Sequence, residues 1–402
     1  MQQIFKDIIH SLKSIAFLPQ WWAQRWHKRD PYLWTFGDME GLRYGDSTRA
    51  LYEYVLANYP EIRCVWMTRN LVVYKQLKKA GRPVALCGTK EGSDIQYNAG
   101  YFFATHGRTH GIYDGDERYM NGIQFIDLWH GVPLKTIGED ERFAKYGKHT
   151  LAKRIKTVIR RGIMPWEFVS GKVLCGSPFF VSFYQSAFQI PRDRVWVTPE
   201  PRLDKFHSSY TEPLIRQLNE DFSMPTKVLY MPTFRDNQKF FNPFENTDFN
   251  AETFTQVLEE QNIVFIYKGH FFDGSALKLN NNKRIISIDD SNYDDLYTFI
   301  KDVDILITDY SSVYFDFLYL RKPIILFPFD YDDYMVHSRP FYFDYNLMKA
   351  RRVLSWKEME ICLANKDYYP PTEEEIQLFR PLPAEHCCEN IVRELQKSLP
   401  PR

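Results

Sequence analysis

The stretch ITDYSSVYFDFLYLRKPIILFPFD, residues 307–330, decides the fold. Two apolar runs with strand character, residues 304–308 and 323–328, flank a segment that has the pattern of a helix. The junction between the first run and the helix holds Asp309, Tyr310, Ser311 and Ser312. Two interpretations of the serines fit. They cap the first helical turn, or they join the free N–H groups and the helix dipole in holding an anion.

The same alternation of strand and helix continues over most of the chain. From Tyr32 onward, strand patterns such as YLWTFG, IRCVWMT, PVALCG, AGYFFAT and IQFIDLWHG alternate with helical patterns such as STRALYEYVLANY. A second series begins near Thr226 with KVLYMPTFR, IVFIYKGH, DILITDY and PIILFPFD as its strands. Such alternation predicts an α/β fold with open, mostly parallel sheets. Two doubly wound, Rossmann-like halves facing a central cleft indicate the two-domain architecture called GT-B.

The patterns also predict the boundaries of the parts. We expect an amphipathic helix over residues 1–30, an N-terminal Rossmann-like domain over 31–195, a C-terminal one over 196–383, and a final helix over 384–402. Within the first domain, residues 142–166 are predicted to contain a basic amphipathic helix. The 402 residues are enough for two domains with full cores.

Charge and hydropathy exclude some classes of protein. The chain has 51 basic and 51 acidic residues, so no global field favours nucleic acid as a partner. No apolar run reaches the roughly 18–20 residues that a membrane-spanning helix needs. Six scattered cysteines without a CxxC pair favour a reducing compartment.

Two segments have the composition of membrane-surface helices. Residues 1–30 combine helically spaced apolar residues with Trp21, Trp22, Trp26 and nearby basic residues, and residues 142–161 hold eight Lys or Arg and no acid. Both patterns are typical of helices that lie on an anionic bilayer. The alternatives are a helix packed on its own domain for the first segment, and a solvated face or a grip on a polyanionic acceptor for the second.

Polar residues follow four of the predicted strands, where open α/β sheets gather their ligands. They are His130, Gly131 and Lys135 in WHGVPLK, Thr233 and Arg235 in YMPTFRD, Lys268 and His270 in YKGH, and Asp309, Ser311 and Ser312 in TDYSS. Each has a structural alternative: a histidine that only donates a hydrogen bond, serines that only cap, or Arg235 paired with Asp236. Their joint occurrence at strand ends favours a site for a charged ligand.

A metal site is not expected from the remaining histidines. His106 and His110 are four residues apart in ATHGRTHG, but the segment is a glycine-rich loop with no third ligand in view. No paired carboxylates at a strand end have the pattern of a magnesium site either, so the sequence predicts chemistry without a metal or other cofactor.

The motifs WHGVPLK, YMPTFRD, YKGH and TDYSSVYFDFLYLRKPIILFPFD, in this order, resemble those of the CDP-glycerol glycerophosphotransferase family of teichoic-acid and capsule synthesis. The resemblance runs from about residue 32 to 345, and the conjunction of WHGxPLK with TDYSSxxFD is its most specific part. Two positions depart from the family pattern: Phe271 follows YKGH where proline is common, and Glu200 stands in PEPRLD where glycine is usual.

The resemblance implies an enzyme with a GT-B fold, a CDP-linked polyol phosphate donor and two catalytic histidines, which are His130 and His270 here. Such an enzyme transfers glycerol phosphate from CDP-glycerol to a hydroxyl of a lipid-linked glycan or polymer and releases CMP. The C-terminal domain would bind the CDP donor and the N-terminal domain the acceptor. The implied setting is the cytoplasm, peripherally on the inner face of a bacterial plasma membrane.

General chemistry assigns roles to these residues. Phosphoryl transfer needs positioning and neutralisation of phosphate charge. We expect Arg235, Lys268, Ser311 and Ser312 to bind the donor phosphates, and His130, across the cleft, to act as general base on the acceptor hydroxyl. Further donor- or acceptor-binding candidates are Gly131, Lys135, Thr233, Asp309, Asp316 and Arg202. For Asp316, contact with a ribose or polyol hydroxyl and a plain helix-dipole role fit equally.

Other functions remain open at this point. A CDP-ribitol donor or a nucleotide-sugar donor would use the same fold. A third alternative is a non-catalytic GT-B domain that binds a polyanion through residues 142–161. Retention of both histidines with Arg235 and Lys268 favours an enzyme.

Overall fold

The chain folds into two compact units, which we describe from a computed structural model. The structure describes residues 16–106, 115, 117–146, 158–159, 162, 171–233, 235, 242–269 and 283–401. Unit 1 comprises residues 1–130, 137–204 and 384–402, and unit 2 comprises residues 131–136 and 205–383. The chain therefore enters unit 2 for six residues after His130 before its main crossing after Asp204. The sequence pattern placed that crossing at residue 195 and treated residues 384–402 as a separate helix.

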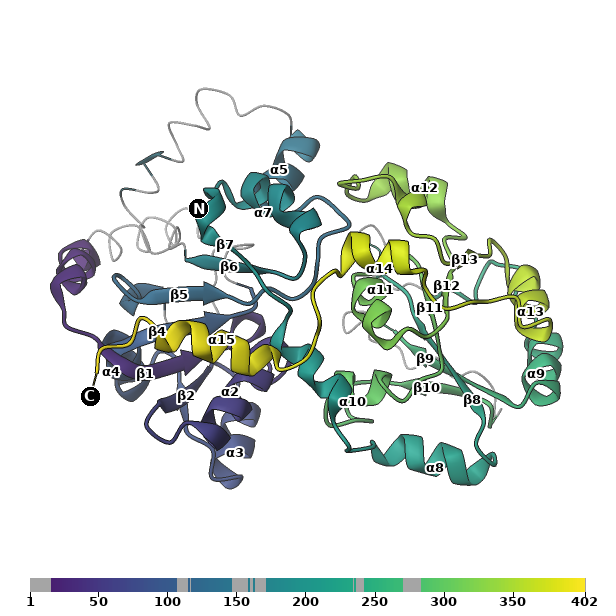
Figure 1. Cartoon of the computed structure of the whole chain (residues 1–402), viewed down its shortest axis with the longest axis horizontal. Helices are drawn as coiled ribbons and strands as arrows, with labels where there is room; N and C mark the ends of the chain where they lie inside the picture. The colour runs from purple at the N-terminus through teal and green to yellow at the C-terminus, as the bar shows by residue number, and fades with distance from the viewer. Residues whose placement is uncertain are drawn as a thin grey trace, which may run out of the picture. The chain divides into compact units, whose positions relative to one another are not determined.

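Unit 1 is built on a parallel sheet of seven strands within the described residues, in the order β3-β2-β1-β4-β5-β6-β7 (Figure 1). The strands are β1 (Asp30–Phe36), β2 (Arg63–Thr68), β3 (Val84–Leu86), β4 (Ala99–Ala104), β5 (Gln124–Asp127), β6 (Lys172–Cys175) and β7 (Val195–Val197). The order reverses direction at β1 and β4, as in doubly wound nucleotide-binding sheets. Both faces of this sheet are covered by helices, so its strands are apolar along their length.

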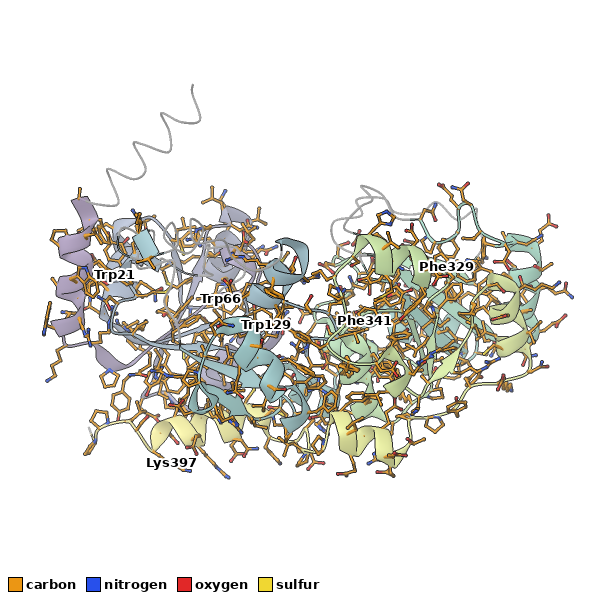
Figure 2. The ribbon with its side chains drawn as sticks, turned by 90° about the horizontal axis from the view of Figure 1, so that it is seen from above. Trp21, Trp66, Trp129, Phe329, Phe341 and Lys397 are labelled. Atoms are coloured by element: carbon orange, nitrogen blue, oxygen red, sulfur yellow. The ribbon has the colours of Figure 1, made fainter. Side chains whose placement is uncertain are left out.

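The helices of unit 1 pack on both faces. They are α2 (Asp46–Asn58), α3 (Leu71–Lys79), α4 (Lys90–Asn98), α5 (Gly138–Tyr146), α7 (Val181–Phe188) and α15 (Cys387–Gln396). Trp34 and Phe36 of β1 join the core beneath α2, α3 and α15, whereas Leu33 joins the core on the opposite face. Trp66 of β2 is fully buried in the first of these cores and is labelled in Figure 2. This alternation is the period of a strand buried on both sides.

The last helix closes unit 1. Helix α15 packs against α2, and both carboxylate oxygens of Asp204 accept the first N–H groups of α15, from Cys387 at 2.7 Å and Cys388 at 2.8 Å. A side chain that satisfies free N–H groups at a helix start stabilises that helix. The chain thus returns to unit 1 by a capped helix directly after the end of unit 2.

Unit 2 repeats the plan with six strands within the described residues, all parallel, in the order β10-β9-β8-β11-β12-β13. These are β8 (Thr226–Met231), β9 (Ile263–Lys268), β10 (Ile285–Ile288), β11 (Ile305–Thr308), β12 (Ile324–Leu326) and β13 (Arg351–Arg352). The helices are α8 (Pro213–Asp221), α9 (Ala251–Glu260), α10 (Leu296–Ile300), α11 (Val313–Phe317), α12 (Tyr331–His337), α13 (Trp356–Ala364) and α14 (Glu373–Phe379). Trp356 of α13 and Phe254 of α9 pack on the sheet in one core.

The predicted α/β class with two doubly wound, parallel sheets is confirmed. The sequence patterns did not predict the short strands β6, β7, β10 and β13. They also did not predict six helices: α4, α7, α8, α12, α13 and α14. The helix predicted after Ser312 is shorter than expected, because α11 ends at Phe317 and continues as a 3-10 turn, Leu318–Leu320.

One side of the described N-terminal segment, residues 16–29, packs against the rest of unit 1. Residues 16–23 are helical, and Trp21 is buried. Arg29 donates to five backbone carbonyls, which belong to α4, the start of β4 and the segment at residues 119–121. Trp22 and Trp26 remain exposed, at 47% and 79%. Residues 1–15 and most of the predicted basic helix at 142–166 lie outside the described residues.

No helix in the described part of the chain has the length and apolar character required to cross a bilayer.

Candidate active site

In unit 1, polar side chains gather at the carboxyl ends of three neighbouring strands. Asp38 follows β1, Thr105 and His106 follow β4, and His130 follows β5. Because parallel strands end at one edge of the sheet, residues that are 25 and 67 positions apart in sequence meet there. The predicted placement of His130 at a strand end is what the structure shows.

The protonation pattern of His130 is fixed by its backbone contact. Nδ1 of His130 lies 2.9 Å from the carbonyl oxygen of Thr105. A carbonyl only accepts, so Nδ1 carries the proton and the lone pair is on Nε2. The nearby Asp127 accepts the N–H of Trp129 with its Oδ1 at 2.9 Å, whereas the group at Nδ1 of His130 is the Thr105 carbonyl. The tautomer is therefore set by a residue that sequence reasoning did not select.

The surroundings keep His130 neutral. The ring is partly exposed, and it contacts the indole of Trp129 and stacks on His106 with centroids 4.1 Å apart and planes 5° apart. Burial, followed by the neighbouring His106, lowers the pKa of His130 from 6.5 to about 3. A neutral imidazole with a defined Nε2 lone pair is the form that a general base requires.

Arg202 lies beside this group but is already paired. Its Nη1 is 2.9 Å from Oδ1 of Asp46, and the Arg202 side chain is buried. Burial opposes ionisation of Asp46, but Arg202 outweighs it, so that the pKa of Asp46 is lowered. Arg202 thus has a compensating carboxylate, which the sequence did not reveal.

The motif that contains His130 is divided between the units. Gly131 has a φ of +154°, a conformation that L side chains rarely adopt, and the residues after it belong to unit 2. There the segment pairs with the chain around Phe341: Lys135 forms an antiparallel bridge with Phe341, and the N–H of Thr136 donates to Pro340. Nζ of Lys135 lies 5.8 Å from the ring centroid of Tyr334.

In unit 2, Arg235 is held between two acids that follow neighbouring strands. Nη2 of Arg235 lies 2.7 Å from Oδ2 of Asp309, and its Nε lies 2.7 Å from Oδ2 of Asp330. Burial opposes the charge of Arg235, but Asp309 and Asp330 outweigh it and raise its pKa. The three groups together carry a net negative charge of about one, because two carboxylates face one guanidinium.

This geometry changes the expectation for several residues. Arg235 was expected to bring positive charge to donor phosphates, yet two carboxylates neutralise its charge. Asp309 is fully buried, and its Oδ1 also accepts the N–H of Thr233 at 2.8 Å. Asp316, expected either to bind a hydroxyl or to favour a helix dipole, instead pairs with Arg380 at 2.5 Å and accepts from the hydroxyl of Tyr297 at 2.7 Å. All three side chains are engaged within unit 2.

Lys268 and Thr233 are buried, whereas the two serines are partly exposed. Nζ of Lys268 pairs with Asp290 at 3.1 Å, and Oγ1 of Thr233 is buried without a hydrogen-bond partner among the described residues. Ser311 and Ser312 are partly exposed; Oγ of Ser311 accepts the N–H of Val313 at 3.4 Å, while Ser312 makes no side-chain cap.

Several predicted residues cannot be placed. His270 lies outside the described residues, as do Asp236 and His110. Among the residues that are described, no group of three or more His, Cys, Asp or Glu side chains has an arrangement suited to a metal ion.

Two parallel sheets of the doubly wound order, with polar side chains at their carboxyl ends, define a GT-B-like protein. The chain belongs to the CDP-Glycerol:Poly(glycerophosphate) glycerophosphotransferase family, whose model matches residues 22–380. The predicted family is thereby confirmed.

Two curated relatives illustrate the range of the family. The chain is 26% identical over 328 residues to the teichoic acid poly(glycerol phosphate) polymerase of Staphylococcus epidermidis, covering 78% of this chain and 43% of the relative. It is 25% identical over 332 residues to the teichoic acid glycerol-phosphate transferase of Staphylococcus aureus, covering 77% of each. The chain thus spans less than half the length of the first relative. Ribitol-phosphate polymerases are also among its relatives.

A solved structure of the wall teichoic acid polymerase TagF superimposes with a TM-score of 0.72 at 22% identity, covering 98% of this chain and 97% of that one. This likeness confirms the GT-B-like fold.

The buried ion triad of unit 2 yields a prediction about stability. Arg235→Ala leaves Asp309 and Asp330 without their cation, so we expect the free energy of unfolding of unit 2 to fall by about 3–5 kcal/mol. Arg321→Ala removes an exposed pair with Glu373 in the same unit and is expected to leave unfolding unchanged. Urea denaturation followed by tryptophan fluorescence measures both, and equal effects of the two variants would contradict a structural role for Arg235.

Proposed function

We propose that the protein transfers glycerol phosphate from CDP-glycerol to a hydroxyl of a lipid-linked glycan or polyol-phosphate acceptor and releases CMP, in the synthesis of a teichoic-acid-like or capsular polymer. The observation that carries this proposal is the hydrogen bond from Nδ1 of His130 to the Thr105 carbonyl. It leaves Nε2 as the proton acceptor at the carboxyl edge of the unit 1 sheet, in a chain of this family.

The proposed step balances as follows. Nε2 of His130 takes the proton of the acceptor hydroxyl while the alcohol oxygen bonds to the phosphorus of the glycerol phosphate group. The bond from that phosphorus to the bridging oxygen breaks, and its electron pair leaves with CMP. The low pKa of free His130 suits this step only once the donor is bound, because a diphosphate close to the ring favours its protonated form.

On the donor side, we assign phosphate contacts to Lys268, the unpartnered hydroxyl of Thr233, and the hydroxyls of Ser311 and Ser312. His270 is proposed as the second catalytic histidine. Arg235 shapes this region indirectly, because its Nη1 donates to the carbonyl of Thr233 at 2.5 Å. These groups supply positive charge and hydrogen bonds without a metal, and we propose that none is required.

The donor is tested by measuring CMP release from a defined lipid-linked acceptor. We expect turnover with CDP-glycerol, in the presence and absence of EDTA. Turnover with CDP-ribitol alone would replace glycerol by ribitol, an alternative that the ribitol-phosphate relatives favour. Turnover only with a nucleotide sugar, or no release from any donor, would overturn the proposal in favour of a sugar transferase or a non-catalytic polyanion-binding domain.

His130→Ala tests the base. We expect kcat to fall by about 10²–10⁴-fold, the usual contribution of a positioned base, while the Kd of CDP-glycerol changes little. His27→Ala, which removes another histidine of unit 1 that contacts Asn98 and Tyr97, serves as the control and should keep normal turnover. Near-normal kcat in His130→Ala would show that the base lies elsewhere.

We also propose that the protein works in the cytoplasm, bound peripherally to the inner face of a bacterial plasma membrane. Trp22 and Trp26 are exposed on the segment whose other side is docked by Trp21, and exposed Arg25 and Lys28 accompany them. Exposed indoles beside basic groups are typical of surfaces that bind anionic bilayers. The protein would then lie at the membrane surface that holds a lipid-linked acceptor.

The variant with Trp22→Ala and Trp26→Ala should bind vesicles that contain phosphatidylglycerol at least about tenfold more weakly, because it loses most of its exposed apolar surface there. Turnover with a soluble acceptor should be retained. The control is Leu354→Ala with Ile361→Ala, two exposed apolar residues of unit 2. Co-sedimentation measures binding, and unchanged binding of the tryptophan variant would remove this surface from the proposal.

A further inference from the structure

A second histidine, His106, stands directly against the proposed base and belongs to a hydrogen-bonded chain of its own. The hydroxyl of Thr105 donates to the carboxylate of Asp38, which is buried. The hydroxyl oxygen of Thr105 lies 3.0 Å from Nδ1 of His106. A hydroxyl has one proton, and Thr105 donates it to Asp38. The hydroxyl oxygen of Thr105 must therefore accept the Nδ1–H of His106. The chain Asp38–Thr105–His106 is therefore directional.

The same threonine orients both imidazoles. Its backbone carbonyl accepts from Nδ1 of His130, and its side chain accepts from Nδ1 of His106. The two rings lie face to face with planes only 5° apart. Both rings thus have the same tautomer, with the lone pair on Nε2.

We infer that His106 is a positioning residue for His130: it fixes the plane of that ring and takes up the proton that would otherwise inactivate the base. This inference rests on the proposed function of His130. Two imidazolium rings at this separation repel each other, so the stacked pair holds one proton at most near neutral pH. Asp38, connected to His106 through Thr105, favours that proton on His106.

The other charged groups that act on His130, among the residues that the structure describes, do not replace this role. They are Asp46 and Arg202, which act on His130 in opposite directions and are bound to each other. Their effects therefore largely offset each other. His106 acts in one direction only, toward the neutral form of His130.

Two variants separate the two parts of the inference. His106→Phe keeps a stacked ring but removes the proton site and the donor to Thr105. His106→Asn keeps a donor at the position of Nδ1 but removes the ring. The control is His27→Phe, since His27 is also a stacked histidine of unit 1, against Tyr97 with centroids 4.0 Å apart.

The direct measurement is an NMR titration of the His130 ring in the full-length protein labelled at histidine, without any substrate. His130 should protonate only at acid pH in the parent protein. In His106→Phe, and also in His106→Asn, its midpoint should rise by about one pH unit, because the competing cation is gone. His27→Phe should not move it. An unmoved midpoint in both His106 variants would overturn the inference.

The kinetic counterpart is the pH profile of kcat/KM for CMP release. Since the base must be unprotonated, a higher midpoint moves the acid limb of the profile to higher pH in His106→Phe. In His106→Asn, kcat should fall about tenfold with the KM for CDP-glycerol unchanged, because the ring of His130 loses its stacking partner. Thermal melting by circular dichroism verifies that each variant folds. A shifted NMR midpoint with no turnover on any donor would support the role of His106 and overturn only the proposed reaction.

Discussion

The parallel direction of every strand pair is the constraint on which the rest of the structure depends. A parallel sheet that is covered on both faces buries mostly apolar side chains along its strands, so polar groups available to a ligand gather where the strands end. In unit 1 this brings Asp38, Thr105, His106 and His130 to one edge from three neighbouring strands. In unit 2 it does the same for Thr233, Lys268 and Asp309. The candidate site follows from topology before any single residue is considered.

The same reasoning explains which parts were predictable. Apolar runs bounded by polar residues identified the long strands and the strand ends that carry His130, Lys268 and Asp309. The strands that were missed, such as β13 with two residues, are too short to show a period. The division of the WHGVPLK motif between the units was also not predictable, because it depends on long-range pairing of residues 131–136 with the segment around Phe341.

The ion-pair partners of the charged candidate residues could not be predicted from the sequence either. Arg235 was selected because charged groups at strand ends usually meet a charged ligand. Asp316 was selected because it could reach a ribose or polyol hydroxyl, and Arg202 was a further binding candidate. Each has a partner far away in sequence: Asp330 for Arg235, Asp46 for Arg202, and Arg380 for Asp316. Net zero charge of the whole chain says nothing about such pairs. Each pair joins segments that are distant in sequence, so it fixes their relative positions within one unit.

Thr105, which belongs to none of the motifs, orients the ring of His130, the proposed base. Its backbone carbonyl and its hydroxyl set two imidazole tautomers, and Asp38 fixes the direction of the hydrogen-bonded chain. A backbone carbonyl cannot change its protonation state, so the tautomer of His130 is the same at every pH where the ring is neutral. An aspartate in this place would instead raise the proton affinity of the ring and stabilise its charged form. A carbonyl together with a stacked second histidine therefore favours a neutral His130, which, in the proposed reaction, gains proton affinity only when the anionic donor binds.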